Sequence, residues 1–419
     1  MPIVANNVPL IGSTGRRRFL GQAGVFGALL ASVPIWSKAA LADATVNLPL
    51  PGGPGLRQLT SAFPQKGVMI LQRTRPPLLE TPFAVFDKGV FTPNDQFFVR
   101  WHWAGIPSQV DVTSFRLAVH GNVNRPLSLS LSDLLTLPRV EMAAVNQCSG
   151  NSRGFFQPRV PGAQWDNGAM GNALWTGFRL RDLLDRAGVK PGSVAVRFKG
   201  LETPVLPTEN HFMKSLSVDH ARDGEVMVAY QMNHEQMPLI NGFPIRLIVP
   251  GWFSTYWMKM LCDIEVLDQP DKNFWTTVAY HIPDTPDGNV TPDQTGYKTV
   301  PVTRMVPRSF VTNLQTGDHV SASSPLPVRG IAFGGDAGVA RVDLSTDGGT
   351  TWRATRLGPD AGKYSFRRWQ AQVTAPASGT LTLKIRCTNT KGETQLATPI
   401  WNPGGFMRNS IETTTLTVT

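Results

Sequence analysis

Hydrophobic and polar positions divide the chain into a mixed region followed by a region of strands alone. Between residues 180 and 187 the apolar positions recur at helical spacing, and Gly188 follows them where a helix commonly ends. The apolar run 245–249 lies between two prolines and predicts a largely buried strand. Such mixed signals continue to about residue 284, and they predict an α+β domain over residues 45–290.

From about residue 300 the pattern changes to short alternating runs separated by turn signals. Strands are expected at 327–333, 339–344, 351–357, 364–373 and 380–389, with a turn at Asp347-Gly348-Gly349. This spacing is typical of a β-sandwich, so an immunoglobulin-like domain is predicted for residues 291–419. Residues 48–93 are rich in proline and glycine and predict an irregular segment that wraps a larger body.

Residues 97–103 alternate cleanly, so a strand there would present two different faces. One face would carry Phe97, Val99, Trp101 and Trp103, and the other Phe98, Arg100 and His102. Two interpretations of the second face remain open. Arg100 and His102 either face solvent, as charged residues commonly do, or line a site together with a reactive group elsewhere in the chain.

Cys148 is the candidate for that reactive group. It lies in a polar, glycine-containing loop, 147–153, after the apolar stretch 140–145, and Arg153 in the same loop could stabilise a thiolate. The other two cysteines, Cys262 and Cys387, lie in apolar alternating runs and are interpreted as core residues. A reactive or metal-binding thiol is therefore expected at Cys148.

The N-terminus has the pattern of a twin-arginine export signal. Arg16-Arg17-Arg18 precedes an apolar stretch at 23–35 and small residues at 39–44. The apolar stretch is shorter than the ~20 residues that span a bilayer, so a cleaved signal over 1–44 is expected, with no membrane span afterwards. This route carries folded proteins to the periplasm, which suggests a bound prosthetic group.

Composition narrows the functional classes. Three cysteines exclude a small domain held together by disulfides. The net charge is +10, yet no cluster of lysine and arginine is interleaved with aromatic residues, so nucleic acid is not an expected partner. A basic surface suits a small anionic substrate or an acidic protein.

Several motifs, taken in order and spacing, resemble the sulfite oxidase family of molybdenum enzymes. They are the segments 98–102, 148–153, 168–175, 241–246 with 250–251, and 400–405. The resemblance covers nearly the whole chain after the signal. It is strongest to the bacterial periplasmic sulfite dehydrogenases and to the related sulfane dehydrogenase of thiosulfate oxidation.

The resemblance implies roles for particular residues. Cys148 matches the family's thiolate ligand to molybdenum, and a soft sulfur ligand suits such a metal. Arg100 and Arg153 match arginines of an anion pocket, and Tyr280 matches an active-site tyrosine near the metal. Tyr230 is the competing candidate, but its place at the end of an apolar run favours a strand-end role.

Contacts to a molybdenum–molybdopterin cofactor are likewise implied by the resemblance. The matching positions are Phe98, Val99, Arg100, Trp101, His102, Glu202, Asn241, Arg246, Trp257, Met258 and Lys259. Asn241 replaces a histidine of the animal enzymes, and Glu202 replaces an aspartate. Trp165 fits either a pocket tryptophan or an ordinary core residue.

The function implied is oxidation of sulfite to sulfate at a molybdenum–pterin centre. The sequence has neither a Cys-x-x-Cys-His haem motif nor the His-Pro-Gly-Gly signature of a fused haem domain, so electrons are expected to pass to a periplasmic c-type cytochrome. The second domain is expected to form a homodimer or a heterodimer. Alternatives are a sulfane dehydrogenase acting on carrier-bound sulfur and a non-enzymatic periplasmic binding protein.

Overall fold

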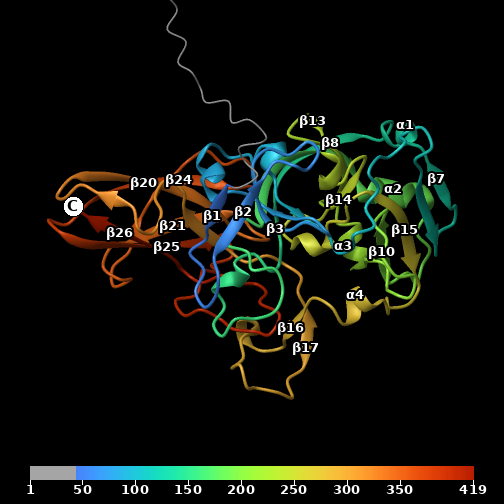
Figure 1. The fold of residues 1–419 in the computed structure, drawn as a ribbon. Helices are drawn as coiled ribbons and strands as arrows, with labels where there is room; N and C mark the ends of the chain where they lie inside the picture. Colours follow the sequence, from blue (N-terminus) through green and yellow to red (C-terminus); the bar gives the residue numbers. More distant parts are fainter. Residues whose placement is uncertain (1–43) are drawn as a thin grey trace, which may run out of the picture. The chain divides into compact units, whose positions relative to one another are not determined.

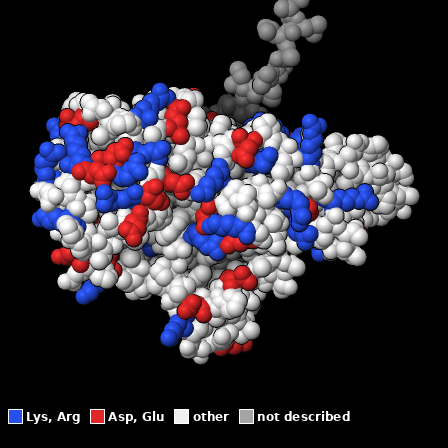
Figure 2. Space-filling view, turned by 180° about the vertical axis from the view of Figure 1, so that it is seen from behind, with Lys and Arg blue, Asp and Glu red and all other residues white. Residues whose placement is uncertain are grey.

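The computed structural model describes residues 44–419, so the predicted export signal lies outside the described residues except for its last residue, Ala44. Within the described part, β-strands form six sheets, and the helices are short (Figure 1). No described helix is long and apolar enough to cross a membrane. On the face in Figure 2, acidic and basic side chains are interspersed.

The first sheet is antiparallel, and three of its five strands come from the proline-rich N-terminal region. Its strands are β1 (Thr45–Asn47), β2 (Leu56–Thr60), β3 (Met69–Arg73), β4 (Leu78–Glu80) and β5 (Val99–Arg100), in that order. The prediction of an irregular segment over 48–93 missed the three short strands β2, β3 and β4, whereas the residues between them form turns, loops and a 3₁₀ stretch as expected. The prolines and glycines lie mainly in the turns, and buried residues such as Met69 and Leu79 anchor the short strands between them.

Two further sheets build the body of the mixed domain. One has the order β11 (Met213–Ser217), β10 (Ala195–Gly200), β15 (Leu261–Leu267), β6 (Leu117–Gly121) and β7 (Leu127–Leu129). The other has the order β13 (Glu235–Gln236), β12 (Met227–Met232), β9 (Met170–Arg179) and β8 (Arg139–Gln147), with β14 (Arg246–Ile248) also paired to β12. The β8–β9 pairing runs without interruption to Gln147 opposite Met170, so the chain leaves the sheet at Cys148.

Four α-helices accompany these sheets: α1 (Leu131–Leu134), α2 (Leu180–Ala187), α3 (Val218–Ala221) and α4 (Phe274–Thr277). Helix α2 confirms the predicted helical spacing, because its four apolar residues are buried and Gly188 ends it in a left-handed conformation at φ +71°. Short 3₁₀ turns lie at Phe83–Asp87, Asn94–Gln96, Arg153–Phe155, Leu239–Asn241, Ser254–Tyr256 and Pro286–Gly288.

The second region consists of two sheets around a shared apolar core, as the alternating pattern predicted. One has the order β18 (Arg308–Val311), β20 (Pro325–Phe333), β24 (Arg367–Thr374) and β23 (Arg356–Leu357). The other has the order β19 (His319–Val320), β26 (Glu412–Val418), β25 (Gly379–Asn389), β21 (Val339–Ser345) and β22 (Arg353–Ala354). A hairpin of β16 (His281–Pro283) and β17 (Thr299–Pro301) precedes them.

The strand expected at 351–357 is instead two short strands in different sheets. β22 pairs with β21, whereas β23 pairs with β24, so the chain crosses between the sheets at Thr355. The Thr355 N–H donates to the Val342 carbonyl at this crossing. Periodicity shows that a strand is present but does not show which neighbour it pairs with.

Candidate active site

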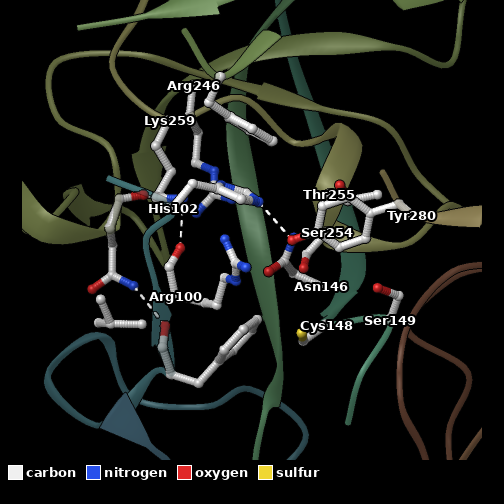
Figure 3. Close-up of a pocket in the computed structure, with 14 residues that line it drawn as sticks. Arg100, His102, Asn146, Cys148, Ser149, Arg246, Ser254, Thr255, Lys259 and Tyr280 are labelled. Atoms are coloured by element: carbon white, nitrogen blue, oxygen red, sulfur yellow. Dashed lines mark hydrogen bonds between the residues drawn. The ribbon is translucent and has the colours of Figure 1, made fainter. Parts of the chain in front are cut away.

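Two cavities meet at four residues: Arg100, His102, Cys148 and Tyr280. The inner cavity is shown in Figure 3. Besides the shared four, it is lined by Phe98, Val99, Asn146, Ser149, Phe212, Asn241, Arg246, Ser254, Thr255 and Lys259. The outer cavity has a volume of about 320 Å³, and the rest of its lining is Arg73, Leu78, Trp101, Arg153, Pro161, Gly162, Ala163, Trp165, Gly404 and Phe406.

Cys148 is placed by the end of β8 and by backbone hydrogen bonds on both sides. Its N–H donates to the Ala169 carbonyl at 2.9 Å, and its carbonyl accepts the Asn151 N–H at 2.9 Å. The residue is only 5% exposed, yet it borders both cavities. Cys387 is fully buried in the second core, and burial raises the pKa of the half-buried Cys262 to about 11, so both match their predicted structural roles.

Residues of the second region make hydrogen bonds to the loop that follows Cys148. Arg308 of β18 is completely buried, and its Nη2 donates to Ser152 Oγ at 2.9 Å and to Glu412 Oε1 at 2.6 Å. The Met407 N–H donates to the Ser149 carbonyl at 2.9 Å. Sequence reasoning missed Arg308, since nothing local connects it to a loop more than 150 residues earlier.

The two predicted arginines hold different positions at the site. Arg100 ends β5 and borders both cavities, and its buried Nη1 has no hydrogen-bond partner. Arg153 borders only the outer cavity, where Nε and Nη2 donate to the Gly404 carbonyl at 3.1 and 3.0 Å and Nη1 to the Ala163 carbonyl at 3.3 Å. Burial lowers the pKa of Arg153, while Cys148 and Tyr280 oppose that shift.

His102 and Tyr280 form a pair at the junction of the cavities. The His102 Nε2 and the Tyr280 hydroxyl are 2.6 Å apart (Figure 3). Burial, together with the charge of Arg100, holds the pKa of His102 well below its usual range, so the ring is neutral. Burial raises the pKa of Tyr280 to about 12, so the phenol keeps its proton.

The backbone at Tyr280 is also unusual, with φ at +60°. A bulky residue in this region costs roughly 1–3 kcal/mol, and such conformations cluster at functional sites. The ring stacks on Phe406 at a centroid distance of 5.4 Å. Tyr230, by contrast, lies on β12 and borders neither cavity.

Two further cations lie at the inner cavity. Arg246 at the start of β14 donates from Nη1 to the Asn241 carbonyl at 2.8 Å, and burial lowers its pKa to about 9. Lys259 donates from Nζ to the Arg100 carbonyl at 2.9 Å, and burial lowers its pKa to about 7. With Arg100, these residues give the inner cavity three basic side chains and no carboxylate in its lining.

The inner cavity also gathers buried polar atoms without partners. They are Arg100 Nη1, His102 Nδ1, Asn146 Nδ2, Ser149 Oγ, Arg246 Nε and Thr255 Oγ1. A buried donor or acceptor left unpaired costs about 1–3 kcal/mol, so six around one space would be satisfied by a polar ligand or by ordered water. The donor-rich, carboxylate-free lining fits a phosphate-bearing pterin. Among residues 44–419, no group of three or more His, Cys, Asp or Glu is arranged to hold a metal.

Most predicted cofactor residues border one of the cavities. Among them, Trp101 borders the outer cavity and not the inner one. Glu202, Trp257 and Met258 border neither. Glu202 is buried behind the site, where it accepts the backbone N–H groups of His102 and Trp103 at 3.2 and 3.0 Å, and burial raises its pKa.

The sequence reasoning also missed residues that line the inner cavity. They are Asn146, Ser149, Phe212, Ser254 and Thr255. Asn146 and Ser149 could have been found, because they flank Cys148 at the point where β8 ends. Trp165, for which two roles were open, is both fully buried and part of the outer cavity wall.

The chain matches two family models in sequence. Residues 103–275 match the oxidoreductase molybdopterin binding domain, and residues 301–417 match the Mo-co oxidoreductase dimerisation domain. The second match identifies the β-rich second region as a dimerisation domain.

The relatives in sequence are sulfite oxidases. The mitochondrial sulfite oxidase of Homo sapiens is 32% identical over 355 residues, which cover 80% of this chain and 63% of that protein. The sulfite oxidase of Gallus gallus is 32% identical over 348 residues, covering 78% of this chain and 73% of that protein. The chain thus spans less than two thirds of the human relative's length.

Among solved structures, the sulfane dehydrogenase SoxCD from Paracoccus pantotrophus has the same fold, with a TM-score of 0.69. The match covers 93% of this chain and 92% of that one at 23% identity. The sequence and fold relationships agree with the geometry around Cys148. The chain belongs to the sulfite oxidase family of molybdenum oxidoreductases.

Proposed function

We propose that this protein oxidises sulfite to sulfate at a molybdenum–pterin centre bound through Cys148. The observation that carries the proposal is the meeting of two unlike cavities at this thiol, one with unpaired buried polar atoms and one lined by arginines. The sequence relatives that are sulfite oxidases support the same reaction. Membership of an oxidoreductase family weighs against the non-enzymatic binding protein.

In this proposal the inner cavity holds the cofactor. Arg246 and Lys259 provide cationic donors for its phosphate, and Asn146 Nδ2 has no hydrogen-bond partner and could bond its polar edges. His102 Nδ1 makes no hydrogen bond either, but it lies 3.8 Å from Glu202 Oε1. Cys148 supplies the protein's thiolate ligand. The bound molybdenum centre would supply the two-electron redox chemistry, and the protein would supply orientation and electrostatics.

The outer cavity binds the anion. Arg100 and Arg153 both border it, and opposite unit charges about 4 Å apart attract each other by on the order of 4 kcal/mol at an effective dielectric of about 20. Arg153 is held by the Gly404 and Ala163 carbonyls, so its guanidinium is already oriented before an anion arrives. Forked N–H donors match oxygen-rich anions.

His102 and Tyr280 form a hydrogen bond at the junction of the two cavities. With the imidazole neutral and the phenol protonated, their 2.6 Å hydrogen bond holds both side chains in place without adding a charge. Glu202 in turn fixes the backbone of residues 102 and 103. These residues orient the junction at which substrate and metal would meet.

A sulfane dehydrogenase acting on carrier-bound sulfur is the second candidate. It is favoured by the size of the outer cavity, about 320 Å³, which exceeds the needs of a four-atom anion, and by the shared fold with SoxCD. A segment of a carrier protein could enter such a space with its sulfur at the tip.

We further propose export to the periplasm, transfer of electrons to a c-type cytochrome, no haem on this chain, and association through the immunoglobulin-like second domain. The sequence pattern of residues 1–44 supports the first, and the dimerisation-domain match supports the last. Light scattering on the purified protein, alone and with a candidate cytochrome, distinguishes a homodimer from a heterodimer.

The decisive experiment compares substrates. Purified, molybdenum-loaded protein is assayed for cytochrome c reduction with sulfite and with sulfane sulfur on a carrier protein. Turnover with free sulfite at a kcat/KM at least about tenfold above that with the carrier supports sulfite oxidation. The reverse ratio supports the second candidate, and reduction with neither substrate contradicts both.

A further inference from the structure

A third arginine borders the outer cavity with Arg100 and Arg153. Arg73 is the last residue of β3 and pairs with Leu78 of β4, which in turn pairs with Arg100 of β5. Three adjacent strands therefore place an arginine, a leucine and an arginine in one row, and all three border the cavity. Since neighbouring strands lie about 4.8 Å apart, the Arg73 and Arg100 backbones are about 10 Å apart.

A local irregularity in β3 brings Arg73 to this position. Leu71 pairs with Leu79, whereas Arg73 pairs with Leu78, so Gln72 is an extra residue on one strand. Such a β-bulge shifts the register and redirects the side chains that follow it. With regular pairing, position 72 would stand opposite Leu78 instead of Arg73.

The charge of Arg73 is not compensated. Among residues 44–419 it has no hydrogen bond or ion pair, whereas Arg153 is bonded to the Gly404 and Ala163 carbonyls. The outer cavity has three arginines and no Asp or Glu in its lining. Arg73 is exposed to solvent, while Arg153 and the Nη1 of Arg100 are buried.

We propose that Arg73 is a substrate-recruiting residue, which captures the incoming sulfur oxyanion at the outer end of the cavity and passes it to Arg100 and Arg153. This inference rests on the proposed function, because it names a binding step of that same site. Arg73 acts on association and not on the chemical step.

The expected size follows from the separation. At about 10 Å, one unit charge changes the local concentration of a monovalent anion about twofold at the dielectric constant of water and about fifteenfold at an effective value of 20. Salt screens the effect, because the Debye length at 0.1 M is also about 10 Å.

The test compares Arg73→Gln with Arg75→Gln, a matched control. Arg75 is exposed and lies two residues away in the turn after β3, but it does not border the cavity. At low ionic strength, the KM of Arg73→Gln for sulfite should rise about two- to fifteenfold, with kcat and molybdenum content unchanged. Arg73→Lys should restore most of the affinity, and the difference should disappear near 0.5 M salt.

Two results would overturn the inference: an unchanged KM in Arg73→Gln at low salt, or an equal rise in Arg75→Gln. A second readout separates this inference from the proposed reaction. Calorimetric affinity for inorganic sulfate should weaken in Arg73→Gln and not in Arg75→Gln, even if the wild-type protein fails to oxidise sulfite. Equal sulfate affinity in the two variants would remove the recruiting role, whatever the reaction proves to be.

Discussion

The inner and outer cavities share four lining residues, and both are lined by positively charged side chains, but they differ in whether their polar groups have hydrogen-bond partners. Six buried polar atoms around the inner cavity lack partners. In the outer cavity Arg153 is already bonded to backbone carbonyls, and Arg73 is solvated. Unpaired buried groups are costly unless a resident ligand satisfies them, whereas bonded or solvated groups tolerate repeated filling and emptying. The difference supports the proposal that the inner cavity holds the cofactor and the outer cavity the substrate.

The most far-reaching effect should come from the inner cavity, because a chain that lacks its cofactor has no activity. Arg246→Met keeps the side-chain volume but removes the cation, and we expect at least a tenfold loss of molybdopterin and molybdenum per chain. Pterin fluorescence and elemental analysis measure this loss. A fully loaded Arg246→Met protein would contradict the assignment of the inner cavity, and Arg153→Gln, which should load normally, is the control.

Arg153→Gln tests the outer side of the comparison. Without the Arg153 guanidinium, kcat/KM for sulfite should fall about a hundredfold. This loss is smaller than the attraction of an isolated charge pair at 4 Å, which is on the order of 4 kcal/mol, because Arg100 and water compensate in part. Steady-state kinetics measures it. If this variant failed to bind molybdenum, Arg153 would also be needed for cofactor binding, and the two cavities would not have separate roles.

Tyr280→Phe probes the junction with a smaller change. The hydroxyl makes the 2.6 Å hydrogen bond to His102, and a single such bond contributes about 1 kcal/mol. We expect kcat/KM to fall about five- to tenfold while cofactor content stays at the wild-type level. An unaltered kcat/KM would show that the pair plays no part in the reaction.

The mildest perturbation is a change of pH, which should alter cofactor binding. Burial lowers the pKa of Lys259 to about 7, and a bound anion would raise it, so binding takes up a proton above pH 7. The affinity of cofactor-free protein for molybdopterin should therefore fall by up to about tenfold per pH unit above 7. Titration by tryptophan fluorescence between pH 6 and 8.5 measures this slope, which Lys259→Met should abolish.

Local patterns in the sequence predicted local features well. Helix α2 with Gly188 and the strands β20, β21, β24 and β25 followed from periodicity and turn residues. The resemblance brought Cys148, Arg100 and His102 together, and the structure places them around one space. These features depend on neighbouring residues or on a motif retained in order.

Features built from distant segments could not be predicted in this way. Arg308 and Phe406 reach the site from the second region, and Arg73 arrives through a β-bulge in a segment expected to be irregular. Trp257 and Met258 lie next in sequence to Lys259, but they pack into the core instead of facing the cavity. Which side chain faces a cavity depends on register and packing, and neither is visible in a motif.

Metal coordination at Cys148 tests the central claim most directly. Molybdenum-edge X-ray absorption on the wild-type protein and on Cys148→Ser counts sulfur ligands while pterin analysis confirms loading. We predict one sulfur ligand fewer in the variant, with the pterin retained and sulfite-dependent cytochrome c reduction lost. An unchanged sulfur count together with full activity would contradict the account.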